Sequence, residues 1–224
     1  MRIPETPRSE DMTTQDYAYH RLRNAVIVGA IPPGTSLTFR GIALEFGLSP
    51  TPVREAIRRL STENAIEVLE NRRLRVPEMT AGRLDELLEL RVSLECHAAK
   101  RALPHLTDLQ IDELQALDDD MDRSLAAGDL DALTRTNQTF HRSLYSANPD
   151  QAAVPLVESI WLQLGPFLRQ VLHRIDQDGA DYHKAILSAL RARDAEALTR
   201  ALEQDIRNGS IQAGRVLLDT PPAP

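Results

Sequence analysis

Residues 37–60 contain two helical patterns separated by one glycine, and this spacing restricts the fold more than any other feature of the chain. The first pattern ends at Gly47, which breaks a helix, and Ser49 followed by Pro50 is typical of the start of the next one. In the second helix the apolar side chains recur at helical spacing and the basic ones lie outside their stripe: Val53, Ile57 and Leu60 against Arg54, Arg58 and Arg59. A short helix, a tight turn and a second helix with exposed arginines indicate a helix-turn-helix.

Two short segments rich in apolar residues follow, at 66–69 and 74–76, and they predict a pair of strands. The residues between them, 70–73, are polar and include two arginines. The sequence therefore predicts the winged form of the helix-turn-helix, with a basic tip on the wing.

The charge of the chain is unevenly distributed. The net charge of −7 argues on its own against a nucleic-acid partner. Residues 17–76, however, carry nine arginines and five glutamates, a net charge of +4, whereas residues 79–224 carry a net charge of −8. A basic N-terminal part followed by an acidic remainder fits a DNA-binding domain joined to a separate regulatory domain.

From residue 80 onward the chain has helical periodicity and no strand signal. Capping residues and Gly or Pro breakers divide it into the predicted helices 80–103, 108–127, 129–147, 150–174, 179–192 and 195–217. We therefore expect a mainly α protein: an α/β winged helix-turn-helix at 13–77, opened by a helix at 16–29, and an all-α antiparallel bundle of six to seven helices at 78–218. Residues 1–12 are polar and contain proline, which predicts disorder.

Several function classes are disfavoured by what the sequence lacks. No apolar run reaches the roughly 18 residues of a membrane span, and the N-terminus has no apolar core typical of a secretory signal. The single cysteine, Cys96, excludes an intrachain disulfide. These features predict a cytoplasmic protein. No catalytic motif is present, so an enzyme is not expected, although histidines and carboxylates in a helical cavity leave metal-assisted chemistry as an alternative.

Several segments of the sequence resemble those of a known protein family. PGTSL, LSPTPVREAIRRL and the hairpin ending at Val76 resemble the DNA-binding domain of GntR-type bacterial transcription regulators. RVSLECHAAKRA, NQTFHRSLYSAN and HKAILSALRARDAEALTRAL resemble, in family order, the helical ligand-binding domain called FCD in the FadR subfamily. The resemblance implies a homodimeric regulator, in most cases a repressor, that binds double-stranded operator DNA and responds to a small carboxylic acid. A dimeric DNA-binding protein with a purely structural helical domain is the other alternative.

A set of polar residues is expected to contact DNA. Side chains near the start of a recognition helix reach base edges, which points to Thr51 and Arg54, with Ser49 near a phosphate and Arg58 as a further phosphate contact. The resemblance adds Arg40 from the preceding helix and the wing tip, Asn71, Arg72 and Arg73, near the minor groove. Pro50 stands where many relatives have arginine, and Arg72-Arg73 stands where Arg-Gly is usual, so the operator should differ from theirs.

The resemblance also implies a metal site in the second domain. The family commonly holds a metal with an Asp, a His four residues later and two further histidines, and the matching residues here are Asn137, His141, His183 and Asp205. The first Asp has become Asn and the last His has become Asp, so one formal negative charge is kept. Two nitrogen and two oxygen donors favour a divalent ion such as zinc, nickel or manganese, with less preference for soft metals. The alternative is a metal-free polar pocket.

Arg91 is the candidate for effector binding. The resemblance places it where a ligand carboxylate would be held, and a guanidinium pairs with carboxylates through two parallel hydrogen bonds. Glu95 follows one helical turn later, so an ion pair within the helix is the alternative.

Overall fold

The computed structural model describes residues 3–70, 73–172, 182–208, 214 and 217–218. The chain divides into two compact units, one formed by residues 1–80 with 161–170 and the other by residues 81–160 with 171–224. In the described residues the protein is mainly helical, as the sequence predicts, with one small sheet in the first unit.

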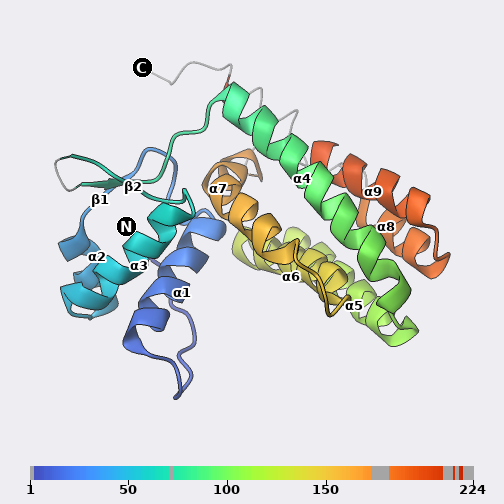
Figure 1. Ribbon diagram of the computed structural model, residues 1–224, viewed down its shortest axis with the longest axis horizontal. Coiled ribbons are helices and arrows are strands. Elements are labelled where there is room, and N and C mark those ends of the chain that lie inside the picture. The colour runs from blue at the N-terminus through green and yellow to red at the C-terminus, as the bar shows by residue number, and fades with distance from the viewer. Residues whose placement is uncertain (1–2, 71–72, 173–181, 209–213, 215–216, 219–224) are drawn as a thin grey trace. The chain divides into compact units, whose positions relative to one another are not determined.

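The first unit is a winged helix-turn-helix (Figure 1). Its helices are α1 (Thr14–Ile27), α2 (Phe39–Phe46) and α3 (Pro50–Thr62). Three strands of two residues each, β1 (Ser36–Leu37), β2 (Glu67–Val68) and β3 (Leu74–Arg75), form an antiparallel sheet in the order β1-β3-β2. Leu74 of the central strand lies opposite Leu37 on one side and Val68 on the other. The strand β1 is absent from the sequence prediction, because the turn-forming residues before Ser36 leave no apolar run like those at 66–69 and 74–76.

The turn between α2 and α3 follows the sequence signals closely. Gly47 ends α2 in the left-handed conformation, with φ of +64°, where a side chain would cost roughly 1–2 kcal/mol. The amide of Leu48 donates to the carbonyl of Ala43 at 2.9 Å and closes the turn. Ser49 occupies the N-cap position of α3, but its side chain makes no capping hydrogen bond. Pro50, which needs no amide partner, takes the first helical position.

The core of this unit confirms the predicted apolar stripe and corrects the expected disorder of the N-terminus. Val53, Ile57 and Leu60 are fully buried. Ile3, in a segment with a disordered composition, is also buried in this core. The guanidinium of Arg21 donates to the carbonyl oxygens of Ile3 and Pro4, both at 3.2 Å. The buried Ile3 and Arg21 thus hold in place a segment whose composition predicts no fixed structure.

The second unit is built from helices. They are α4 (Ala81–Ala102), the 3₁₀ helix η1 (Leu103–His105), α5 (Asp108–Ala126), α6 (Leu130–Ser146), α7 (Val154–Leu172, with residues 161–170 assigned to the first unit), α8 (Tyr182–Arg191) and α9 (Ala195–Asn208). Helix α4 packs against α6 and α9, α5 packs against α6 and α8, and α8 packs against α9 (Figure 1). The predicted end of one helix at 174 and start of the next at 179 lie outside the described residues.

Side-chain caps explain why α5, α6 and α9 begin at or next to the predicted residue, whereas α7 begins at Val154, four residues after its predicted start. Thr107 accepts from the amide of Gln110, whose side chain accepts from the amide of Thr107, forming a capping box at the start of α5. Asp129 caps α6, and Asp194 accepts from two amides at the start of α9. No helix in the described part of the chain combines the length and apolar content needed to cross a lipid bilayer.

Candidate functional site

Helix α3 exposes the side chains predicted to read DNA. Thr51, Arg54 and Arg58 are exposed on α3, Ser49 is exposed directly before it, and Arg40 is exposed on α2. Arg73 is exposed immediately before β3, whereas Asn71 and Arg72 lie outside the described residues. The described members of the predicted set are therefore all accessible to a partner.

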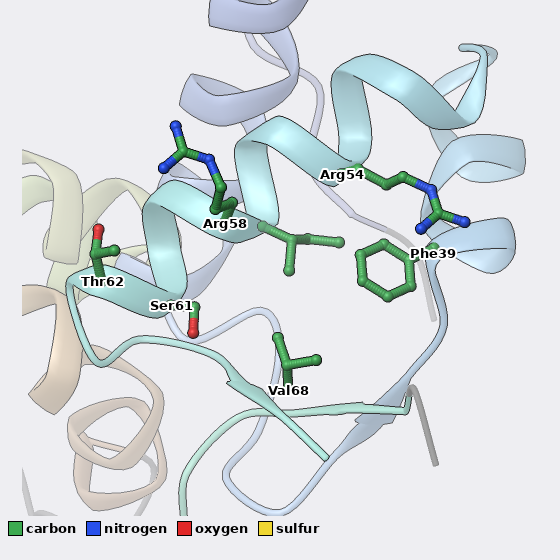
Figure 2. A pocket seen from close by; sticks show the side chains of 7 residues that line it. Phe39, Arg54, Arg58, Ser61, Thr62 and Val68 are labelled. Carbon is green, nitrogen blue, oxygen red and sulfur yellow. The ribbon is translucent and has the colours of Figure 1, made fainter. Parts of the chain in front are cut away.

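Arg54 and Arg58 differ in how their charge is balanced (Figure 2). The guanidinium of Arg54 lies 5.0 Å from the centre of the Phe39 ring, a contact that orients the group and keeps its charge. The guanidinium of Arg58 forms an ion pair with Glu55 at 2.8 Å. Both arginines border a concavity of about 270 Å³ between α3 and β2, lined by Phe39, Arg54, Ile57, Arg58, Ser61, Thr62 and Val68. The guanidinium of Arg54 thus faces an aromatic ring, and that of Arg58 a carboxylate.

Arg59 is turned away from this face, although the sequence groups it with the exposed arginines. Its guanidinium lies 3.1 Å from a carboxylate oxygen of Asp16 and 3.6 Å from the centre of the Tyr19 ring, both on α1. Arg59 therefore joins α3 to α1, a role that periodicity alone does not reveal.

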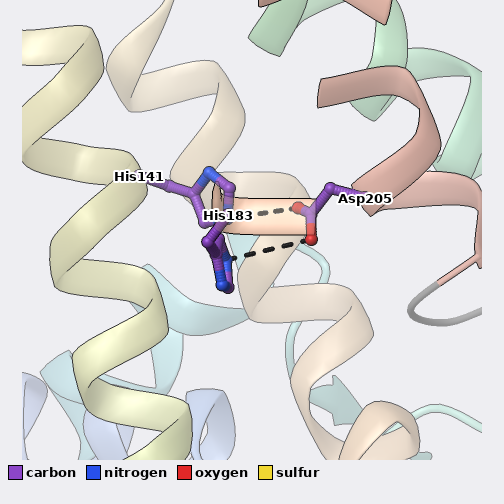
Figure 3. Close-up of side chains that lie close together, drawn as sticks. All are labelled: His141, His183 and Asp205. Atoms are coloured by element: carbon purple, nitrogen blue, oxygen red, sulfur yellow. Dashed lines mark ion pairs between the residues drawn. The ribbon is translucent and has the colours of Figure 1, made fainter. Parts of the chain in front are cut away.

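The second unit brings together the four residues predicted to hold a metal. His141 on α6, His183 on α8 and Asp205 on α9 each offer one donor atom, and these atoms lie within 4.8 Å of one another (Figure 3). Nε2 of His141 is 3.3 Å from Oδ2 of Asp205, and Nε2 of His183 is 3.8 Å from Oδ1. Asn137, one turn before His141, places its Nδ2 at 3.2 Å from Nε2 of His183. In this orientation the amide donates to His183 and does not present its oxygen.

The carboxylate of Asp205 is ionised in this pocket. Burial raises its pKa, but His141 in its protonated form, through a hydrogen bond and its charge, and the charges of His183 and Arg91 lower it further, so the pKa lies below its usual range. The side chain of His141 is 1% exposed and that of Asp205 14% exposed. A buried anion therefore faces the two imidazoles.

Three further residues surround the cluster, and the sequence does not assign them to the site. The hydroxyl of Tyr145 lies 3.1 Å from Nδ1 of His141 and donates to Oε2 of Glu95 at 2.8 Å. Oδ1 of Asp118 lies 3.5 Å from Nδ1 of His183. Tyr145 is four residues after His141 on the same helix face, so the spacing offers a signal for it. Asp118 lies in an acidic run on α5 that has no such distinguishing mark.

Arg91 is buried beside this network. Its Nε donates to Oε1 of Glu95 at 2.6 Å, which is the pair expected from their spacing. The interactions of Glu95 with both Arg91 and Tyr145 connect Arg91 to His141 through two intervening side chains.

Burial raises the pKa of the Cys96 thiol to about 11, so this cysteine is a core residue and not a nucleophile.

The two parts of the chain match two family models. Residues 14–76 match the bacterial regulatory proteins of the GntR family, and residues 86–208 match the FCD domain. The winged helix-turn-helix lies within the first match and the His141–His183–Asp205 cluster within the second.

Individual relatives and solved structures agree with these matches. The chain is 28% identical to the HTH-type transcriptional regulator McbR of Escherichia coli, over 90% of this chain and 93% of that protein. It is 24% identical to the HTH-type transcriptional repressor RspR of Escherichia coli, over 91% and 90% of the two chains. A solved structure of McbR superposes with a TM-score of 0.82 at 27% identity, covering 88% of this chain and 95% of the other. The protein therefore belongs to the GntR family of bacterial transcription regulators, in the FadR subfamily that carries a C-terminal FCD domain.

Proposed function

We propose that this regulator is a cytoplasmic repressor that binds a two-fold symmetric operator as a homodimer and is controlled by a small carboxylic acid. Its DNA-binding domain spans residues 13–77, and its effector domain, 78–218, holds a divalent ion. The observation that carries the effector half is the convergence of His141, His183 and Asp205 from three helices. As a transcription regulator the chain is not an enzyme, so the ion would serve recognition and not turnover.

The charges around the cluster support a divalent ion. Asp205 and Asp118 are two largely buried carboxylates, and both face imidazoles. With both imidazoles neutral the group carries two negative charges, and buried charge is costly unless it is compensated. One divalent cation supplies the compensation. His141, His183 and Asp205 would hold it, and Asn137 would complete the set by turning its amide oxygen inward.

Arg91 supports a carboxylic acid as the effector. It is a buried guanidinium close to the cluster, and its Nε is the atom bonded to Glu95. The other donors of the guanidinium are those that a ligand carboxylate would take. An ion that leaves coordination positions to a ligand, together with a buried arginine, forms a site suited to a small organic acid.

Selection of binding sites from random DNA, followed by anisotropy titration, tests the proposed function. We expect the selected DNA to be two-fold symmetric and to bind two chains, because one recognition helix reads a half-site. A panel of carboxylic acids, added with zinc, nickel or manganese, should contain a compound that weakens DNA binding. Intact DNA binding that no acid or metal alters would favour the effector-independent alternative, and failure to select any DNA would contradict the DNA-binding role.

The wing provides a prediction about salt dependence. We expect the Arg72→Ala/Arg73→Ala double variant to bind the operator more weakly, because each arginine neutralises phosphate charge beside the groove. The slope of log affinity against log salt concentration should fall by about one for each phosphate that the variant no longer neutralises. Anisotropy titrations over a salt series measure this slope, and a slope equal to that of the wild type would show that the wing tip does not touch the DNA backbone.

A further inference from the structure

We propose that Tyr145 and Asp118 are positioning residues that hold both imidazoles of the cluster in the tautomer with the proton on Nδ1. This inference rests on the proposed metal site and adds two residues outside the predicted ligand set. Both side chains are buried, with 0% of Tyr145 and 1% of Asp118 exposed. Each lies beside the Nδ1 atom of one histidine, whereas both Nε2 atoms lie toward Asp205.

For His141 the hydrogen bonds fix the direction of the proton. The hydroxyl of Tyr145 donates to Oε2 of Glu95, at 2.8 Å, so its proton is directed away from His141. The phenol oxygen is then an acceptor, and the group 3.1 Å away from it, Nδ1 of His141, must donate. Arg91 holds Glu95 from its other oxygen at 2.6 Å, which keeps the acceptor in place. In the neutral ring the lone pair of His141 is thereby left on Nε2, 3.3 Å from Oδ2 of Asp205, and a hydrogen bond between these two atoms requires the protonated ring.

For His183 two neighbours, Asp118 and Asn137, favour the same tautomer, and they oppose Oδ1 of Asp205, which lies 3.8 Å from Nε2. The Asp118 carboxylate at 3.5 Å attracts a proton on Nδ1, and the amide of Asn137 donates toward Nε2 at 3.2 Å, which requires a lone pair there. Groups that accept from the far nitrogen of a coordinating imidazole orient the ring and raise its basicity.

The consequence is that His141, His183 and Asp205 are prearranged as donors, whereas Asn137 would still turn its amide away from Nε2 of His183. Two Nε2 lone pairs and an ionised carboxylate point into one volume, where a proton on either Nε2 would block coordination. The arrangement lowers the cost of binding because neither ring needs to exchange its proton or flip when the ion enters.

The test compares zinc binding by four variants of the full chain. We expect Tyr145→Phe and Asp118→Asn each to weaken zinc binding roughly 10- to 100-fold in a competition titration with a chromophoric chelator. Two controls make the same changes elsewhere. Tyr17→Phe alters a partly exposed tyrosine of the first unit, and Asp119→Asn alters the exposed neighbour of Asp118; both should bind zinc as the wild type does.

A second measurement reads the tautomers without any metal. Long-range ¹H–¹⁵N spectra of the metal-free wild type at about pH 8, above the ordinary histidine pKa, should show the Nδ1–H form for His141 and His183. Tyr145→Phe should shift His141, and not His183, toward the Nε2–H form, and Asp118→Asn should do the reverse. A merely structural role in packing would not move the two rings separately.

The outcomes separate this inference from the proposed metal site. If the wild type binds zinc and both variants bind it equally well, the positioning roles are wrong and the metal site stands. If the wild-type rings carry their protons on Nε2, the positioning roles are also wrong, even where the variants fail to fold. If the wild type binds no zinc, nickel or manganese, the metal site and this inference both fall.

Discussion

Replacing His141 with alanine is expected to abolish the stabilisation that a divalent ion gives to this protein. A ligand that binds only the folded state raises the free energy of unfolding by about 2.7 kcal/mol at a concentration 100 times its dissociation constant. In the proposed site His141 would supply one of two nitrogen donors, and it is 1% exposed, so water cannot easily replace it. His183→Ala should have the same effect. Thermal melts of metal-free protein with and without zinc, nickel or manganese measure the change.

The remaining ligands should differ in importance. Asp205→Asn is expected to weaken metal binding more than Asn137→Ala, because it removes the carboxylate, whereas the amide of Asn137 now donates to His183. Asn137→Asp adds a second carboxylate and should strengthen binding, which makes it a control for nonspecific damage. If the metals raise the melting temperature of His141→Ala and the wild type equally, the ion is bound elsewhere.

The same melts should depend on pH in a defined direction. Imidazoles coordinate only when neutral, so metal stabilisation should decline as pH falls through the histidine range. The pKa of Asp205 is held below its usual range, so its carboxylate stays ionised over this interval and does not cause the decline. Disappearance of the stabilisation only below the ordinary Asp range would contradict coordination by histidine.

Replacing Arg54 with alanine is expected to remove about 1–3 kcal/mol of specific DNA binding, which corresponds to roughly 5- to 150-fold in Kd. Arg54 is exposed on the recognition helix, and its position beside the Phe39 ring orients its guanidinium. The variant should lose affinity for the selected operator and bind scrambled DNA nearly as well as the wild type does. Anisotropy titrations with both DNAs, at one fixed salt concentration, give the two values.

Two neighbouring changes sharpen this test. Phe39→Leu keeps Arg54 and removes only the ring beside it, so its effect should be in the same direction and smaller. Arg58→Ala should weaken binding to both DNAs alike, because Arg58 is predicted to contact phosphate. Full affinity of Arg54→Ala for the operator would show that the base contacts come from other residues.

The sequence predicts the helix-turn-helix well because its signals are local. Gly47 must adopt a left-handed turn, and the spacing of Val53, Ile57 and Leu60 defines the buried face without reference to other elements. The expected disorder around Ile3 is wrong, and the sequence does not reveal the role of Arg59, because the partners of both residues are distant in the chain. Ile3 is held by Arg21, and Arg59 by Asp16 and Tyr19, which no periodic pattern reveals.

The second unit shows the same limit at the candidate site. Asn137, His141, His183 and Asp205 can be named from a family resemblance, and the structure brings them together. Asp118 and Tyr145 cannot, because their importance depends on which ring nitrogen each one faces. That information requires the packing of α5, α6 and α8. The spacing of Tyr145 from His141 places both on one helix face but does not reveal which ring nitrogen the hydroxyl faces.

The sheet of the first unit has a consequence for how new operator preferences can arise. Strand β3 pairs with β1 on one side and with β2 on the other. The amide of Leu69 donates to the carbonyl of Arg73 at 2.8 Å and closes the loop that connects β2 to β3. The loop is thus anchored by backbone groups, which every amino acid other than proline provides. Mutations in the loop should therefore carry little penalty to folding. Because the wing is proposed to contact DNA, we expect this loop to be a position where regulators of one lineage diverge in target while keeping a common scaffold.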